Sequence, residues 1–270
     1  MIEPWIVDVS RYQAIIDPPR ETKHINWQTM KDKGIKVAGI RCTGGNYYRD
    51  SEFHYNFEEA YKVGIIPIPY LFNTPENKPE EQISYFYKYL GDKASELCMP
   101  PVLDCELVRN KNPQAITANI EKCLKLLEDK EGRVPIIYTA AWFWNPNVLR
   151  SSKWIKYPSW IAWYPDDLNY AGALPTRYCP PDWVVAGVSK QTIWQKWADS
   201  CGKGKEYGAW SSGLDLSWYN GTPAQFDAQF GTSISGTTPE PPLPPTPSTI
   251  EQRVTSIENA IKKNTDWDLS

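Results

Sequence analysis

Two carboxylates, separated by one residue, end a short apolar segment in the first half of the chain. Asp104 and Glu106 follow Val102 and Leu103. Side chains alternate between the two faces of a β-strand, so Asp104 and Glu106 point to the same side as Val102. Leu103 and Cys105 then point to the opposite side. Alternate Cα atoms of a strand are roughly 6.5 Å apart, so both carboxylates can reach one substrate group.

This pair of acids has a recognisable chemistry. Two carboxyl groups held close together resist simultaneous ionisation, so the pKa of one of them should rise. An acid that keeps its proton beside an ionised carboxylate is the pair that most glycosidases use. The alternative is a strand end that carries two solvated acids, and the rest of the chain has to decide between the two interpretations.

Composition restricts the class of protein. A chain of 270 residues with 41% hydrophobic residues can bury a large core without disulfides. The net charge of -3 gives no basic surface for nucleic acid, so no nucleic-acid partner is expected. The 13 Trp and 16 Tyr residues supply flat apolar faces with a polar edge, which suit both core packing and sugar stacking.

The sequence contains few residues or motifs that could bind a metal or a cofactor. His24 and His54 are the only histidines, which leaves no basis for a zinc site or a His-based triad. A phosphate loop, a dinucleotide fingerprint and a Gly-x-Ser-x-Gly elbow are all missing. The six cysteines form no C-x-x-C pair, which predicts reduced thiols, with a Cys179–Cys201 disulfide left open. We therefore expect neither a metal nor a cofactor.

Apolar strand-like segments alternate with amphipathic helical segments in the first half of the chain. The expected strands are 5–10, 37–41, 65–70, 101–106, 134–139, 159–163, 192–197 and 214–219, and the expected helices are 27–33, 50–63, 79–97 and 113–130. After Thr139 the helical segments disappear. This order predicts an irregular, TIM-like, eight-stranded β/α barrel over residues 1–231, with helices missing in its second half.

The last forty residues differ in composition. Residues 232–249 are rich in proline, which predicts a stiff extended linker. Ser248 and Glu251 form a capping-box pattern ahead of a short C-terminal helix over 250–270. Its apolar stripe is Ile250, Val254, Ile257 and Ile261, at heptad spacing. Self-association through residues 250–264 is one prediction; a frayed tail and the start of another module are the alternatives.

Acids at the carboxyl ends of barrel strands line the active-site mouth. Asp8 ends the first expected strand and Asp215 lies in the last. These two strands become neighbours when a barrel closes, so Asp8 and Asp215 should meet. Four carboxylates then converge at one mouth with Asp104 and Glu106. Buried acids without partner cations are costly, and Arg41 on the second strand is the one obvious cation. The convergence therefore favours a functional site.

Four other side chains occupy similar positions near strand ends. They are Tyr70, Tyr138, Trp163 and Gln195. We expect them to bind substrate, and packing in the core or at the rim is the alternative for each. Gln195 has an amide that can hydrogen-bond a sugar hydroxyl.

The chain resembles glycoside hydrolase family 25, the Chalaropsis-type lysozymes or N-acetylmuramidases. The matching segments are Asp8-Val9-Ser10-x-x-Gln13, Ile25-Asn26-Trp27, Ile40-Arg41-x-Thr43-x-Gly45, Pro101-Val102-Leu103-Asp104-x-Glu106, Ile137-Tyr138-Thr139, Trp160-Ile161-Ala162-x-Tyr164, Trp194-Gln195 and Gly213-x-Asp215. They run in family order over nearly all of the first 220 residues. Each segment is weak alone, and the ordered set is specific.

The resemblance implies an irregular eight-stranded β/α barrel that hydrolyses the β-1,4 bond between N-acetylmuramic acid and N-acetylglucosamine in bacterial peptidoglycan. By the family pattern, Glu106 would be the general acid. Asp104 would orient the substrate's 2-acetamido group or stabilise the positive ring that forms. Asp8 and Asp215 would shape the site and tune Glu106. If Asp104 assists the acetamido group, configuration is retained; if Asp8 or Asp215 activates water, it is inverted. We favour retention.

Two positions depart from the family pattern. Members often carry an acidic or amide residue where this chain has Gly44, and a histidine where it has Leu71. Neither position is one of the four acids, so the departures bear on subsite contacts and on the type of wall that is attacked.

The biological setting follows from the resemblance and the N-terminus. Met1–Trp5 contains no basic region followed by an apolar stretch, and no apolar run in the chain is long enough to span a membrane. We expect a phage lytic enzyme made in the bacterial host cytoplasm without a signal peptide, acting on the cell wall after lysis or from the virion. The rivals are a non-catalytic glycan-binding module, a structural phage component and a chitinase-type barrel, whose D-x-x-D-x-D-x-E run is missing.

Overall fold

The computed structural model describes residues 4–17, 21–164, 192–197 and 202–234. The predicted helix 250–270, most of the predicted linker and the Cys179–Cys201 pair lie outside the described residues. Their predictions therefore stay predictions.

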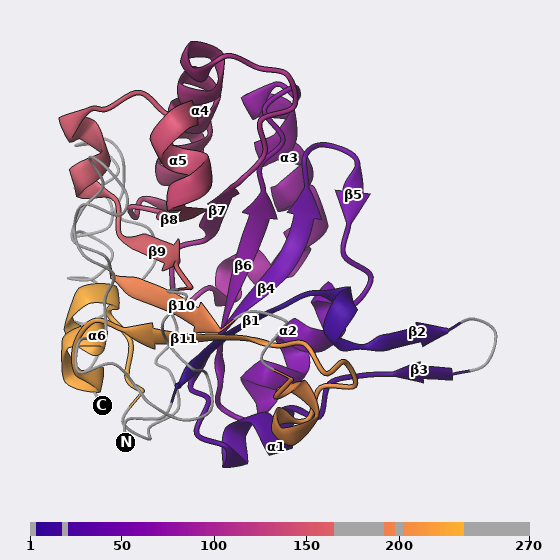
Figure 1. Cartoon of the computed structure of the whole chain (residues 1–270). Coiled ribbons are helices and arrows are strands. Elements are labelled where there is room, and N and C mark those ends of the chain that lie inside the picture. Colours follow the sequence, from indigo (N-terminus) through magenta and orange to yellow (C-terminus); the bar gives the residue numbers. More distant parts are fainter. Residues whose placement is uncertain (1–3, 18–20, 165–191, 198–201, 235–270) are drawn as a thin grey trace, which may run out of the picture.

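Eight strands close into a barrel, as the sequence predicts (Figure 1). In order around the barrel they are β1 (Ile6–Val9), β4 (Val37–Gly44), β6 (Ile66–Phe72), β7 (Val102–Cys105), β8 (Ile136–Ala140), β9 (Ser159–Ala162), β10 (Ile193–Trp197) and β11 (Asp215–Tyr219). Neighbours from β1 through β4 to β10 run parallel. Strand β11 is antiparallel to both β10 and β1, and it closes the barrel.

Helices follow the strands mainly in the first half of the chain. The described α-helices are α1 (Trp27–Asp32), α2 (Phe53–Lys62), α3 (Pro79–Leu90), α4 (Pro113–Glu131), α5 (Ala141–Asn147) and α6 (Pro223–Phe230). Local signals explain several boundaries. The Asn26 side chain accepts a hydrogen bond from the Thr29 amide and caps α1. Asn112 does the same for Ala115, with Pro113 at the first position of α4.

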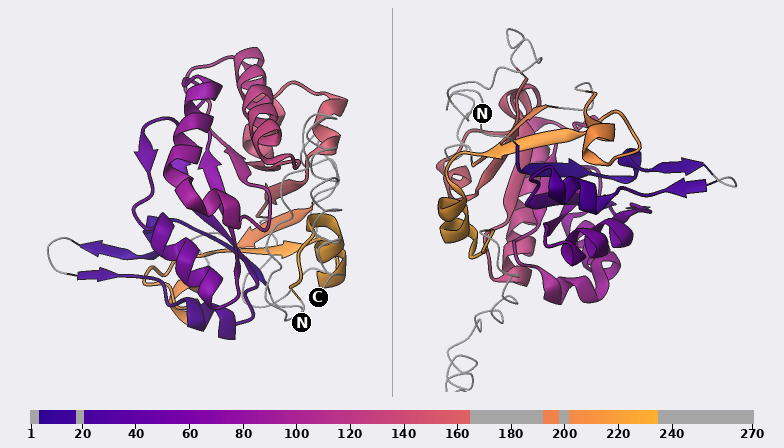
Figure 2. Two further views of the ribbon diagram at one scale, coloured as in Figure 1. Left: turned by 180° about the vertical axis from the view of Figure 1, so that it is seen from behind. Right: turned by 90° about the horizontal axis from the view of Figure 1, so that it is seen from below.

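Some elements differ from the predicted ones. Helix α3 ends at Leu90 because Gly91 adopts a positive φ of 60°, and a 3₁₀ turn covers Gly91–Glu96. After β8 the described residues contain two short α-helices, α5 and α6. The patterns also miss a hairpin of β2 (Ile15–Asp17) and β3 (Glu21–Lys23), which projects from the barrel (Figure 2).

A second missed hairpin lies at the end of β4. Strand β5 (Tyr48–Arg49) pairs antiparallel with Thr43 and Gly44, so Gly44 belongs to the strand and the turn begins at Gly45. Gly45 has a φ of 55°, a conformation that favours glycine, and a Cβ there would lie 2.3 Å from the Asn77 side chain.

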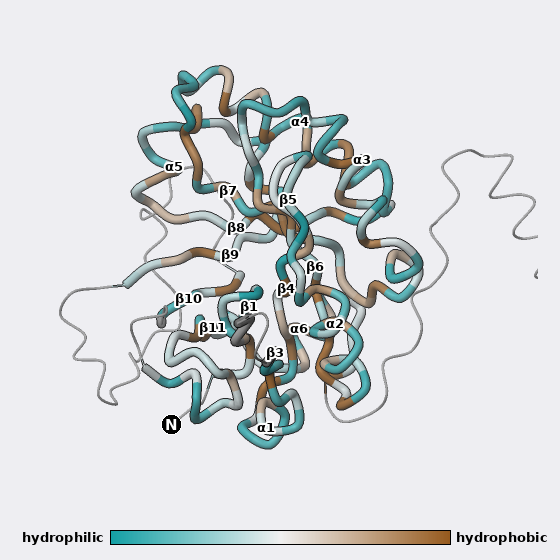
Figure 3. Tube along the Cα trace, turned by 90° about the vertical axis from the view of Figure 1, so that its right-hand side faces the viewer, coloured by the Kyte–Doolittle hydropathy of each residue, from teal (hydrophilic) through white to brown (hydrophobic). Residues whose placement is uncertain are grey.

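The core has two layers. One fills the space between the barrel and its helices, and it includes Leu103 and Cys105 on the outward face of β7. The other fills the lower interior of the barrel with Ile6, Val37, Ile66, Ile68, Met99, Val102, Ile136, Trp160 and Ile193. Brown, hydrophobic segments occur along β4, β6 and β9, whereas hydrophobic and hydrophilic residues alternate along the outer helices (Figure 3).

Helix α6 closes the lower end of the barrel. The Phe226 ring lies 5.0 Å from Trp5 and 5.1 Å from Tyr219, centroid to centroid. Ile234 belongs to the same cluster, so the packed unit extends three residues past the predicted boundary at 231.

Two further properties of the described chain bear on its chemistry. Cys42, Cys98, Cys105 and Cys123 are free thiols. None of the described helices combines the length and the apolar character needed to cross a bilayer.

Candidate active site

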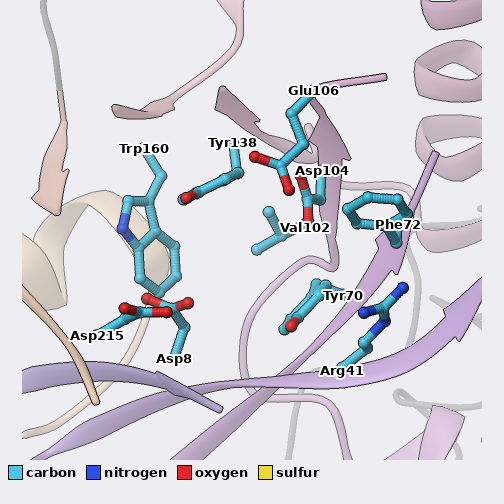
Figure 4. Close-up of a pocket in the computed structure, with 10 residues that line it drawn as sticks. All are labelled: Asp8, Arg41, Tyr70, Phe72, Val102, Asp104, Glu106, Tyr138, Trp160 and Asp215. Carbon is cyan, nitrogen blue, oxygen red and sulfur yellow. The ribbon is translucent and has the colours of Figure 1, made fainter. Parts of the chain in front are cut away.

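A pocket of about 120 Å³ opens at the end of the barrel where the parallel strands terminate. Its walls come from seven of the eight strands or the residues next to them (Figure 4). The lining residues are Asp8, Arg41, Tyr70, Phe72, Val102, Asp104, Glu106, Tyr138, Trp160 and Asp215. All four predicted acids are therefore brought together, along with Arg41, Tyr70 and Tyr138.

Strand β7 places the first pair of acids. Val102, Asp104 and Glu106 all face the pocket, and Leu103 and Cys105 face the outer core, as alternation predicts. Asp104 is 6% exposed, whereas Glu106, just beyond the strand end, is only partly buried. Glu106 is thus the more accessible acid of the pair.

The second pair of acids comes from the first and last strands. Asp8 of β1 lies directly opposite Asp215 of β11 in the strand register. Because β11 is antiparallel, its first residue lies at the same end of the barrel as the last residues of the parallel strands. Figure 4 shows these two acids side by side, across the pocket from Asp104 and Glu106. The predicted meeting of Asp8 and Asp215 is confirmed.

Burial changes the acidity of the β7 pair. It raises the pKa of Glu106 above its ordinary range, and the positive charge of Arg41 opposes that rise. Deep burial, together with the nearby negative charges of Glu106 and Asp8, also raises the pKa of Asp104. No described residue hydrogen-bonds to Asp104 Oδ1. The pair therefore holds a proton at pH values where an exposed carboxyl group has lost it.

Arg41 is held by aromatic rings rather than by a carboxylate. Its guanidinium carbon lies 4.5 Å from the centroid of Phe72 and 4.8 Å from that of Tyr48. Its buried Nε has no hydrogen-bond partner among the described residues. The cation is therefore free to act on a group that enters the pocket.

Gln195 supports the site from behind the lining. Its Nε2 donates to Asp8 Oδ2 at 2.8 Å, and its Oε1 accepts from the Tyr138 hydroxyl at 2.9 Å and from the Tyr164 hydroxyl. The side chain is 1% exposed. Gln195 was predicted to contact a sugar hydroxyl, but the structure places it where it orients Asp8.

Phenol groups complete the polar wall. Burial raises the pKa of Tyr70 and of Tyr138, so both hydroxyls keep their protons and can donate hydrogen bonds. Burial also raises the pKa of Tyr164.

Trp163 lies elsewhere. It is not a lining residue of the pocket; its ring packs 5.7 Å from Trp194, and its carbonyl accepts a hydrogen bond from Trp194 Nε1 at 2.8 Å. Trp160, which the sequence analysis did not select, faces the pocket instead. Trp160 is opposite Tyr138 in the register of β8 and β9, and its Nε1 donates to Ser217 Oγ at 3.0 Å. The signal was strand alternation, because Trp160 and Trp163 lie on opposite faces.

A glycine makes room for this tryptophan. A Cβ on Gly39 of β4 would lie 3.0 Å from Trp160 Cη2 and 3.2 Å from Asp8 Cβ. Gly39 therefore lets the indole and the carboxylate share the interior of the barrel. Phe72 and Tyr164 are two further residues of the site that the sequence analysis did not select.

Metal binding finds no support in the part of the chain that the structure describes. Within it, no three His, Cys, Asp or Glu side chains are grouped so that they could hold an ion. The chemistry of the pocket is that of its carboxyl groups, phenols and one guanidinium.

A closed β/α barrel with paired acids of raised pKa at its mouth defines a site of the glycosidase type. The family model described as glycosyl hydrolases family 25 matches residues 7–201. The chain belongs to this family.

Curated relatives and solved structures agree with this assignment. The chain is 26% identical to Lysozyme M1 of Streptomyces globisporus over 81% of its own length and 68% of that protein. It is 29% identical to the uncharacterised protein YegX of Escherichia coli over 58% of its length, and it spans 55% of YegX. The crystal structure of a bacterial lysozyme from Streptomyces coelicolor superposes with a TM-score of 0.64 at 25% identity, covering 83% of this chain and 95% of that one.

Proposed function

We propose that this protein is a muramidase that hydrolyses the β-1,4 bond between N-acetylmuramic acid and N-acetylglucosamine in bacterial peptidoglycan. The observation that carries the proposal is the meeting of two acid pairs in one pocket, with a raised pKa for Glu106. Membership of glycosyl hydrolases family 25 and the likeness to Lysozyme M1 support it.

Glu106 is the general acid in this proposal. It is the more exposed member of the β7 pair and lies at the pocket mouth, where the glycosidic oxygen of a bound strand can reach it. Burial raises its pKa, which favours the protonated form that a general acid needs. Protonation of the leaving oxygen then allows the bond to the anomeric carbon to break.

Asp104 acts on the sugar ring whose glycosidic bond is broken, rather than on the leaving oxygen. It is deeply buried, and its free Oδ1 can accept a hydrogen bond from the 2-acetamido group or face the positive charge that develops on the sugar ring. We propose that the acetamido oxygen attacks the anomeric carbon with this help as the bond to the leaving oxygen breaks. Water, giving its proton to Glu106, then displaces the acetamido oxygen from the same carbon, so that the product retains configuration. The anomer formed first, observed by NMR, tests this step.

Asp8 and Asp215 shape the opposite wall. Gln195 fixes the Asp8 carboxylate through a 2.8 Å hydrogen bond, and the two phenols fix Gln195. In this proposal Asp8 and Asp215 keep the local potential negative, which favours the protonated form of Glu106 and the positive transition state.

Release of muropeptides from purified peptidoglycan by wild type and Glu106→Gln tests the function, with products identified by mass spectrometry and reducing-end labelling. The proposal expects new N-acetylmuramic acid reducing ends from wild type and almost none from the variant. N-acetylglucosamine ends would show that the bond is wrong. Wall binding by folded wild type without any release would indicate a glycan-binding module.

The biological setting is part of the proposal. We propose a bacteriophage lysin whose partner is the host cell wall. Zymography on walls from several hosts, followed by a search for the protein in purified virions, distinguishes an endolysin from a virion-borne enzyme.

A further inference from the structure

One wall of the mouth continues outward as a stack of alternating rings and guanidinium groups. From the pocket to the surface its members are Phe72, Arg41, Tyr48, Arg11 and Tyr12, which we call the cationic stack. Arg41 lies 4.5 Å from the Phe72 centroid and 4.8 Å from that of Tyr48. Arg11 lies 5.7 Å from the Tyr48 centroid and 5.1 Å from that of Tyr12. The stack thus links a pocket wall to Tyr12, which is 60% exposed.

A buried carboxylate holds the stack in place. Asp50 is fully buried, and its Oδ2 accepts hydrogen bonds from the Arg11 amide at 3.0 Å and the Tyr48 hydroxyl at 3.3 Å. Its Oδ1 accepts from the Glu52 amide at 3.0 Å. Asp50 therefore positions the backbone of one stack member and the ring of another before any ligand arrives, which lowers the entropy lost on binding.

The charges of the stack are available to a ligand. Neither Arg11 nor Arg41 forms an ion pair within 4 Å with a carboxylate of the described chain. The Asp50 oxygens are instead occupied by two amides and a phenol. Two guanidinium groups, spaced by aromatic faces, match a ligand that combines sugar surface with negative charge.

An acidic substrate needs a positively charged surface beside the pocket, because the pocket itself is rich in acids. The ionised acids of the pocket repel a negatively charged group, and among the described lining residues Arg41 is the only cation. An acidic substituent on a bound glycan is therefore directed toward the loops after β1 and β4, where the stack lies. The proposed substrate carries such groups, either as the lactyl carboxylate of peptide-free muramic acid or as carboxylates of its peptide.

We propose that the cationic stack binds a carboxylate-bearing substituent of the glycan and thereby selects acidic, muramic-type strands over neutral ones. This inference rests on the proposed function. Arg11 and Tyr12 are binding residues in it, outside the lining of the pocket, and Asp50 is a positioning residue.

The test compares wild type with Arg11→Gln on peptidoglycan in three forms. The first form keeps its peptides, the second has been stripped of peptides so that the lactyl carboxylates are free, and the third has all carboxyl groups converted to methylamides. We expect Arg11→Gln to lower kcat/KM about three- to fivefold on the acidic form whose carboxylate the stack binds. This is the size of effect expected for losing an exposed ion pair together with a cation–π contact. The methylamide form should be cut equally by both proteins. The acidic form that shows the loss identifies the source of the carboxylate.

Arg49→Gln is the matched control. Arg49 also lies over two rings, 5.2 Å from the Tyr85 centroid and 5.4 Å from that of Tyr89, and none of the three lines the pocket. Its substitution should leave kcat/KM unchanged on every form. Equal losses for Arg11→Gln on acidic and methylamide forms, or no loss on any form, would overturn the inference while the muramidase activity of wild type stands.

Binding is measured independently of turnover. Calorimetry with a soluble muropeptide and its methylamide should show weaker binding of the acidic ligand to Arg11→Gln, by the same factor as in the kinetics. Equal affinity of both proteins for the acidic ligand would refute the role of the stack. If wild type releases no reducing ends from any form, the proposed function fails, and the calorimetric comparison still decides whether the stack binds carboxylates.

Discussion

The two ends of the barrel interior are built from the same strands but differ in character. The lower end is packed with apolar side chains, and the mouth is lined by polar ones. At the lower end, Ile6 points inward among apolar neighbours. Two residues further along the strand, Asp8 points inward at the mouth. On β8 the same step leads from Ile136 to Tyr138. Two positions along a strand thus separate an apolar residue that packs in the core from a polar residue that lines the pocket. The apolar residues of the lower end supply stability that the polar residues of the mouth do not.

The energetic difference follows from burial. Apolar side chains at the lower end gain free energy by leaving water. Carboxyl groups at the mouth lose it, as the raised pKa values of Asp104 and Glu106 show. Substitutions at the lower end should therefore lower stability and leave the chemistry intact, whereas substitutions of the mouth acids should impair the chemistry without lowering stability.

The largest effect is expected at the mouth. Glu106→Gln should reduce kcat about 10²- to 10⁴-fold, because a general acid contributes that much, while the melting temperature changes little. Wild-type activity should also fall as pH rises through the raised pKa of Glu106, since the acid must be protonated. Initial rates across pH and thermal melts of both proteins measure this. Glu59→Gln, at an exposed ion pair, is the control that should retain full activity.

Phe226→Ala tests the lower end. Phe226 is fully buried between Trp5 and Tyr219, so its loss should lower the free energy of unfolding by about 3–5 kcal/mol. Activity per folded molecule should be unchanged well below the melting temperature. Denaturant titration and active-site-normalised rates measure the two quantities. A fall in kcat comparable with that of Glu106→Gln would mean that the two ends are not separable.

Gln195→Leu lies between the extremes. It keeps the volume and removes the amide that donates to Asp8 and accepts from two phenols. A misplaced carboxylate should lower kcat/KM about 10- to 100-fold. Gln28→Leu, whose amide donates only to an exposed Asp32, is the matched control. Unchanged kinetics in Gln195→Leu would show that Asp8 needs no support.

The smallest effect concerns stability at the mouth. The pKa of Asp104 is raised in the folded state, so its ionisation opposes folding once the pH exceeds the ordinary carboxyl pKa. Asp104→Asn should therefore stabilise the fold at pH 7 by about 0.5–2 kcal/mol. The gain should shrink as the pH falls below the ordinary carboxyl pKa, to about pH 2–3, where the carboxyl group is protonated in both states. Melting curves at the two pH values, with Asp92→Asn as an exposed control, measure it.

Much of this contrast could be predicted from residue order. Strand alternation alone placed Asp104 and Glu106 together, and barrel closure placed Asp8 beside Asp215. The sequence was less informative where strand register or a tertiary contact determines which side chain faces the pocket. Trp163 was selected because it ends an apolar run, yet β9 pairs so that Trp160 faces the pocket. Gln195 was correctly given a polar role, but its partner is Asp8 rather than a sugar.

Short elements were also missed for physical reasons. Helix α5 contains Pro146 and begins with no side-chain cap, so neither helix signal marks it. The β2–β3 hairpin has only three residues in each strand, too few for a clear alternation. The cationic stack was invisible because Arg11 and Phe72 are far apart in sequence and meet through Tyr48 and Arg41.

The antiparallel closing strand has a consequence for the order of synthesis. A ribosome makes β1 before the other barrel strands, but its hydrogen-bonding partner β11 follows only after most of the described chain has been made. Until then the growing chain has an open sheet, and the edge of β1 that later pairs with β11 is unpaired. Asp8 therefore lacks its neighbour Asp215. Contacts between such distant segments form slowly. The catalytic mouth is therefore assembled last, and a nascent or truncated chain lacks a complete set of acids.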